Sequence, residues 1–131
     1  MHTETIASIC KQDIKDLQGV YLFGSYANDY ATPKSDVDIA ILCRKRLTPK
    51  LKNKLIMKLE DSLHMNIDLI ELRFANTILQ EEILLTAKRI ATFDKKMCEL
   101  FEDYVYCSAM DFREFRKPHI MEIIARGSVY G

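Results

Sequence analysis

The chain is 131 residues long, close to the commonest length of a single globular domain, with 48% hydrophobic and 29% charged residues. This length allows one sizeable core but excludes a catalytic domain joined to a large second domain. Because 19 basic residues balance 19 acidic ones, the formal net charge is zero, and no general attraction to nucleic acid is indicated.

The first part of the chain alternates one helical pattern with two short strand patterns. Apolar residues at helical spacing over 3–17 predict an amphipathic helix, which we expect Gly19 to end. The apolar runs 20–23 and 36–43 are suited to buried strands. Between them lies a polar segment, residues 24–35.

The middle of the chain continues this alternation. Thr48 followed by Pro49 is typical of a helix start, since Thr caps the first turn and proline fits its first position. An apolar stripe over 51–63 then predicts a helix that packs one face on the core. Residues 66–72 read as a third strand.

The last part contains a predicted helix around 76–87, a short strand near 89–93 and helical spacing from Lys95 onward. Pro118 is expected to kink or restart that last helix. The alternation of helices and strands predicts an α/β or α+β sheet domain. We expect one domain over 1–131, with a catalytic core at 1–94 and a C-terminal helical segment and tail at 95–131.

Asp36 and Asp38 are the first candidate site residues. Because successive side chains of a strand alternate between its faces, both carboxylates are expected on one face, opposite Val37 and Ile39. Two adjacent carboxylates repel each other unless a cation lies between them. Oxygen ligands of this kind suit magnesium, although a DxD pair by itself is often only a solvated strand edge.

Gly24 and Ser25 directly follow the first predicted strand. A glycine there lets backbone amides approach a ligand, and a following helical turn would point N–H groups at phosphate. Gly-Ser alone is usually just a turn, and the sequence contains neither GxxxxGK[ST] nor GxGxxG. We include Lys34 and Ser35, which precede the paired aspartates, among the candidate nucleotide-binding residues.

Asp68, in the third predicted strand, is the candidate third acid. If that strand neighbours the one that carries Asp38, the acids could hold two magnesium ions and help to deprotonate an attacking hydroxyl. Asp61 and Glu71 lie nearby in the sequence and compete for the same role.

The order of these features resembles the nucleotidyltransferase superfamily that includes DNA polymerase β. Its signature is Gly-Ser, about ten residues, Asp-x-Asp and an acid on a later strand; here the spacer 26–35 has ten residues. The short length of the chain, the sequence of residues 24–42 and the tail at 126–131 are similar to those of the minimal nucleotidyltransferase (MNT) subgroup. The resemblance implies a polymerase β-like fold with a mixed sheet of about four to five strands flanked by helices.

The resemblance also implies a biological role. Minimal nucleotidyltransferases commonly act as antitoxins to HEPN-domain ribonuclease toxins, and members transfer AMP from ATP to a tyrosine hydroxyl of the toxin. On this basis Gly24, Ser25, Asp36, Asp38 and Asp68 match the family motif, with ATP as substrate, magnesium as cofactor and a HEPN toxin as partner. No membrane or direct nucleic-acid partner is expected.

One departure leaves alternatives open. Many relatives carry a basic residue and a glycine where this chain has Asn28 and Asp29, so Lys34 or another cation would have to substitute. The alternatives are an antitoxin that neutralises its toxin by binding alone, and a transferase that modifies small molecules such as aminoglycosides.

Three further features concern location and surfaces. The four widely spaced cysteines form no CxxC pair and predict reduced thiols in a cytoplasmic protein. Seven basic residues and no acid lie between Asp38 and Glu60, typical of a solvated face or of a patch that attracts an acidic ligand. Aromatic residues of the last helix are expected in the core or on a partner surface: Phe101, Tyr104, Phe112 and Phe115.

Overall fold

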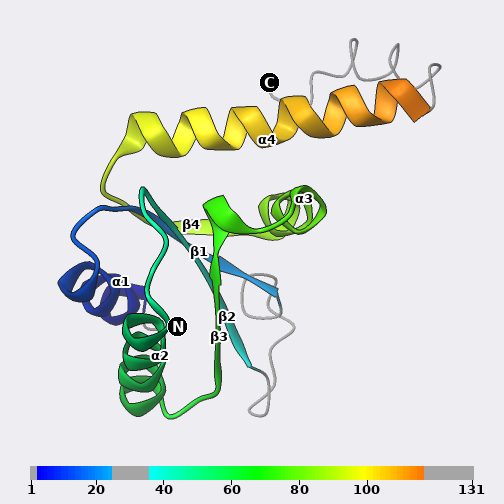
Figure 1. Cartoon of the computed structure of the whole chain (residues 1–131). Helices are drawn as coiled ribbons and strands as arrows, with labels where there is room; N and C mark the ends of the chain where they lie inside the picture. Colours follow the sequence, from blue (N-terminus) through cyan, green and yellow to red (C-terminus); the bar gives the residue numbers. More distant parts are fainter. Residues whose placement is uncertain (1–2, 25–35, 117–131) are drawn as a thin grey trace.

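Figure 1 shows the computed structural model of the chain, which describes residues 3–24 and 36–116, with side chains up to Met110. The described elements, in chain order, are α1 (Thr3–Asp13), β1 (Leu17–Phe23), β2 (Val37–Cys43), α2 (Pro49–Leu63), β3 (Ile67–Glu71), the 3-10 helix η2 (Leu72–Phe74), α3 (Thr77–Thr86), β4 (Lys88–Thr92) and α4 (Lys95–Arg116).

The described strands form one four-stranded sheet in the order β3-β2-β1-β4. β1 pairs antiparallel with β2 and with β4, whereas β2 and β3 run parallel, joined by the crossover through α2. The sheet is therefore mixed, and the predicted α/β architecture with a C-terminal helical segment is confirmed.

Helices cover both faces of this sheet (Figure 1): α1 and α2 lie on one side, α3 and α4 on the other. The alternation along β2 explains why both faces are covered. Ile39 and Ile41 belong to the core cluster beneath α1 and α2, and Ala40 and Leu42 to the cluster beneath α3 and α4. A strand that is apolar on both faces needs cover on both.

α2 begins at the predicted cap, and α3 has a side-chain cap as well. Thr48 Oγ1 accepts a hydrogen bond from the Leu51 amide at 3.2 Å, and Pro49 opens α2. Asn76 does the same for α3, where its Oδ1 accepts from the Leu79 amide at 2.8 Å. These bonds satisfy amide groups that the first helical turn leaves without partners.

The prediction that Gly19 ends the first helix was wrong. α1 ends at Asp13, and Gly19 lies inside β1, next to a register shift between Leu17 and Gly19. A Cβ atom at Gly19 would stand 2.6 Å from Cys98 Sγ of α4. The glycine therefore serves the close packing of α4 on the sheet, which local sequence does not reveal.

Two polar contacts fix α4 to the sheet. The Tyr21 hydroxyl of β1 donates to Glu102 Oε2 at 2.7 Å, and Arg89 Nη1 of β4 pairs with the same oxygen at 2.9 Å. Further along, the Tyr106 hydroxyl donates to the Leu84 carbonyl oxygen of α3 at 3.1 Å. α4 is therefore tied to β1, β4 and α3 on one side of the sheet.

Three of the cysteines, Cys10, Cys43 and Cys98, are buried, Cys107 is exposed, and all four are free thiols, as the sequence predicts. Over residues 3–24 and 36–116, no helix is long and apolar enough to cross a bilayer. The predicted effects of Pro118 and the positions of Phe112 and Phe115 lie outside the described side chains.

Candidate active site

Asp38 and Asp68 lie directly beside each other on neighbouring strands. They are register partners in the parallel pair of β2 with β3. Their neighbours Val37, Ile39 and Leu69 are buried in the cluster on the α1/α2 side. Because side chains alternate along a strand, both carboxylates face the α3/α4 side of the sheet. The predicted neighbourhood of the two acids is confirmed.

Asp36 completes a group of three acids at this end of the sheet. It is exposed and lies immediately before β2, which begins at Val37, one residue later than predicted. Burial raises the pKa of Asp38, and the negative charges of Asp68 and then Asp36 raise it further. The carboxylates of Asp68 and Asp36 are thus close enough to Asp38 to repel its charge.

Gly24 follows β1 and touches the same carboxylate. Phe23, the last residue of β1, is the register partner of Asp38. Gly24 has a φ of 74°, in the left-handed region that glycine adopts most readily. A Cβ atom there would overlap Asp38 Oδ2 and stand 3.1 Å from Asp38 Cγ. A side chain at this position would therefore displace the carboxylate.

The donor set suits magnesium, which prefers carboxylate oxygens. In the described part of the chain, no three His, Cys, Asp or Glu side chains already stand as a metal-binding group. A bound cation would offset the repulsion that Asp38 experiences from Asp68 and Asp36. Asp36, Asp38 and Asp68 are the residues that could turn toward a common ion.

The two competing acids lie elsewhere. Asp61 is exposed on α2, which packs on the opposite side of the sheet. Glu71 ends β3 at its far end, where its Oε1 accepts a hydrogen bond from the Leu47 amide at 2.7 Å. The fold therefore places Asp68, and neither competitor, beside Asp38.

Three candidate nucleotide-binding residues, Ser25, Lys34 and Ser35, lie outside the described residues, as do Asn28 and Asp29. Of the predicted phosphate-binding set, Gly24 alone is placed. Its position beside Asp38 gives the Gly-Ser motif and the paired aspartates a shared location at one end of the sheet.

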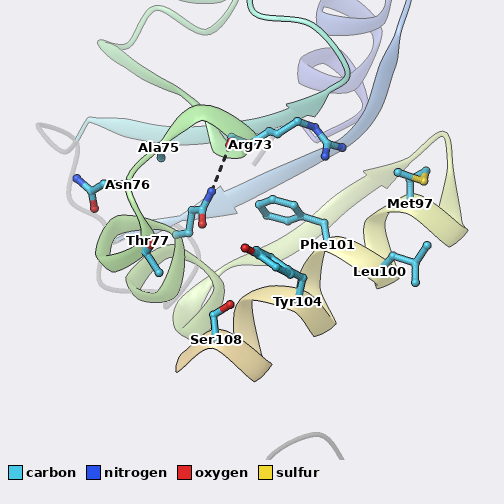
Figure 2. Close-up of a pocket in the computed structure, with 10 residues that line it drawn as sticks. Arg73, Ala75, Asn76, Thr77, Met97, Leu100, Phe101, Tyr104 and Ser108 are labelled. Carbon is cyan, nitrogen blue, oxygen red and sulfur yellow. Dashed lines mark hydrogen bonds between the residues drawn. The ribbon is translucent and has the colours of Figure 1, made fainter. Parts of the chain in front are cut away.

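A groove that the sequence did not indicate lies between α3, η2 and α4 (Figure 2). It has a volume of about 560 Å³, and Arg73, Thr77, Phe101 and Tyr104 are among its lining residues. The Arg73 Nε donates to the Cys43 carbonyl oxygen at 3.0 Å, and its guanidinium lies 5.5 Å from the Phe101 ring centroid. No short motif predicts this groove, because residues far apart in the sequence form it.

Comparison with known sequences shows which family and which relatives this chain is similar to. Residues 4–96 match the family described as "Polymerase beta, Nucleotidyltransferase", a span of more than half of the chain. The protein adenylyltransferase MntA of Shewanella oneidensis is 32% identical over 90 residues, which are 69% of this chain. The chain spans 65% of that relative's length, just under two thirds.

Solved structures share the fold over nearly the whole chain. One is a chain of a toxin–antitoxin crystal structure with AMP-PNP, with a TM-score of 0.79, 27% identity and coverage of 95% of this chain and 99% of that one. Another comes from a complex of a tri-AMPylated Shewanella oneidensis HEPN toxin with an MNT antitoxin, with a TM-score of 0.72, 27% identity and coverage of 93% and 95%. With its acids on adjacent strands and its mixed sheet, the chain belongs to the polymerase β nucleotidyltransferase family.

Proposed function

We propose that this chain is an antitoxin that transfers AMP from ATP to a tyrosine hydroxyl of a HEPN-domain toxin, in a magnesium-dependent reaction, and so inactivates it. One observation carries the proposal: Asp38 and Asp68 are register partners, with Asp36 two residues away and Gly24 against the Asp38 carboxylate. A structural role explains poorly why three repelling acids share this end of the sheet.

The relatives support the choice of reaction and partner. The related protein of Shewanella oneidensis is named a protein adenylyltransferase, and one structural neighbour is a toxin–antitoxin with AMP-PNP, an ATP analogue. In another, the HEPN toxin is tri-AMPylated and bound to an MNT antitoxin. A nucleotidyltransferase that resembles these proteins over at least 93% of its length is expected to act on the same class of partner.

The chain's own residues have separate tasks. Asp36, Asp38 and Asp68 would hold magnesium, which when bound supplies positive charge to the triphosphate and the departing pyrophosphate. Asp68 would accept the proton of the attacking hydroxyl, whose oxygen bonds to the α-phosphorus as pyrophosphate leaves. Gly24 keeps backbone close to Asp38, and Ser25, Lys34 and Ser35 are proposed to bind the phosphates.

The expected consequence for the toxin is electrostatic. An attached AMP group adds negative charge and bulk beside a site that must bind the negatively charged RNA backbone. Repulsion of the substrate then inactivates the toxin. We place this reaction in the cytoplasm, and we retain the single-domain division with the core at 1–94 as part of the proposal.

The test is intact-mass spectrometry of the cognate HEPN toxin after incubation with this chain and ATP, with magnesium or with EDTA. We expect a mass gain in whole AMP units with magnesium and none with EDTA, and peptide mapping should place the group on tyrosine. A stable complex without any mass gain would instead indicate an antitoxin that acts by binding alone. AMP transfer to a small hydroxylated acceptor but not to the toxin would indicate a small-molecule transferase.

A further inference from the structure

Charged residues are distributed unevenly in this chain, although its formal net charge is zero. Residues 44–58, from the loop before α2 into α2, carry seven basic residues and no acid. Residues 76–87 and 97–110, which comprise α3 and most of α4, carry five acids and no basic residue. Figure 1 shows α3 and α4 on the opposite side of the sheet from α2. The α3/α4 side therefore carries two acidic stretches, although α4 begins with Lys95 and Lys96, and the α2 side carries a basic stretch that ends before Glu60.

The α3/α4 side also exposes large apolar side chains. On α3, Ile78 is 68% exposed and Leu85 58%, and on α4, Leu100 is 52% and Tyr104 67% exposed. Each pair lies seven or four residues apart, so it forms a stripe along its helix. We call these four residues, with the exposed acids Glu82 and Asp103, the α3/α4 face.

The stripe on α4 borders the groove of Figure 2, which α3 lines from the other side. Thr77, next to Ile78, lines it from α3, and Leu100 and Tyr104 line it from α4. Asp38 and Asp68 face the same side of the sheet, because their strand neighbours Ala40 and Ile70 pack in the cluster beneath α3 and α4. A protein bound on the α3/α4 face would therefore sit on the same side as the candidate active site.

We infer that the α3/α4 face docks the protein substrate, and that its acids select the basic, RNA-binding surface of that substrate. The inference rests on the proposed function. A ribonuclease needs positive charge where it binds the RNA backbone. AMP transfer silences that surface, so the toxin must present it to the carboxylates. An acidic face complements it, with exposed apolar and aromatic anchors.

α4 also lies almost wholly outside the family match, which ends at residue 96. The structures from toxin–antitoxin complexes nevertheless cover 93–95% of this chain, which reaches well beyond that point. The helix that carries Leu100, Asp103 and Tyr104 is therefore an addition to the common catalytic core that this chain shares with chains from such complexes.

The test measures binding of the cognate toxin by calorimetry without ATP or magnesium, at low and at moderate salt. One variant reverses charge on the α3/α4 face, Glu82→Lys with Asp103→Lys, and a second removes an anchor, Tyr104→Ala. The matched control, Lys50→Glu with Lys54→Glu, reverses two exposed charges on α2. All these side chains are exposed, and circular dichroism checks that each variant folds.

We expect the charge reversal and Tyr104→Ala each to weaken binding about tenfold or more. The charge-reversal variant should also lose most of the salt dependence that the wild-type chain shows. The control should bind within about twofold of the wild-type chain, because α2 faces away from the docked protein.

Wild-type binding by both α3/α4 variants would overturn the inference, and so would loss of binding in the α2 control alone. Self-association of the chain that the α3/α4 variants abolish, with toxin binding intact, would assign the face to a second copy and also overturn it. AMP transfer is measured in parallel. If the wild-type chain binds the toxin but transfers no AMP, the proposed function is refuted and the docking face stands. If the charge-reversal variant transfers AMP at the wild-type rate, the docking face is refuted and the proposed function stands. A wild-type chain that does not bind the toxin would refute both.

Discussion

Asp38 lies in β2 between two other carboxylates, Asp68 on the neighbouring strand and Asp36 two residues earlier. Burial, Asp68 and Asp36, in that order, raise its pKa above the ordinary value of 3.8. A raised pKa means that the folded chain binds this proton more tightly than the unfolded chain does. The charged form of Asp38 therefore opposes folding at neutral pH.

Asp38→Asn should stabilise the chain at neutral pH, because the amide is uncharged. The gain should be a rise of a few degrees in Tm at pH 7 in EDTA. Stability gained from protonation is present below the unfolded pKa and lost as pH rises through the folded pKa. The difference between variant and wild type should therefore shrink toward pH 4. A variant less stable than the wild type at pH 7 would show that Asp38 contributes a contact that outweighs its charge.

Much of the candidate site was predictable from individual residues and their spacing. The period of two in a strand predicts Asp36 and Asp38 opposite Val37 and Ile39; the fold confirms this for Asp38, whereas Asp36 lies just before β2. The third acid was not fixed by spacing, because Asp61 and Glu71 are equally near in the sequence. Only the parallel pairing of β2 with β3 selects Asp68, since that pairing is a tertiary contact.

At the scale of elements, α4 is held by a polar network centred on Glu102. Its Oε2 accepts from the Tyr21 hydroxyl at 2.7 Å and pairs with Arg89 at 2.9 Å. Tyr21 is 2% exposed, so its hydroxyl has little access to water. Burial, and then the bond to Glu102, raise the pKa of Tyr21, which remains a neutral donor.

Glu102→Ala should destabilise the chain by about 2 kcal/mol, because it leaves the buried Tyr21 hydroxyl without its acceptor and Arg89 without its partner. Urea unfolding followed by circular dichroism measures this change. The neighbouring Asp103→Ala is the control; its side chain is exposed and it should change stability by no more than about 0.5 kcal/mol. Equal losses in the two variants would contradict a structural role for the network.

The start of α2 was predictable because Thr48 supplies its own capping group and Pro49 follows it. The role of Gly19 was not. Glycine is a common helix stop, but here it makes room for Cys98, 79 residues later in the chain. Local sequence patterns predict local geometry, whereas the need for glycine at this position comes from the packing of α4.

Across the whole molecule, the basic stretch 44–58 and the acidic stretches 76–87 and 97–110 lie on opposite sides of the sheet. Asp38 and Asp68 face the side with the acidic stretches. Alternating patterns predicted the fold class and the run of strands. They did not give the strand order β3-β2-β1-β4 or the antiparallel position of β4. Those depend on which strands meet in space, and so does the side on which α3 and α4 pack.

We propose that Asp36 and Asp38 serve AMP transfer to the toxin and do not hold the fold together. The most direct test is intact-mass spectrometry of the toxin after incubation with ATP, magnesium and either the wild-type chain, Asp36→Asn with Asp38→Asn, or the control Asp61→Asn on α2. We predict AMP addition by the wild type and the control, and a loss of at least about 100-fold in rate for the double variant, which should still fold and bind the toxin. Wild-type rates of transfer by the double variant would contradict the account.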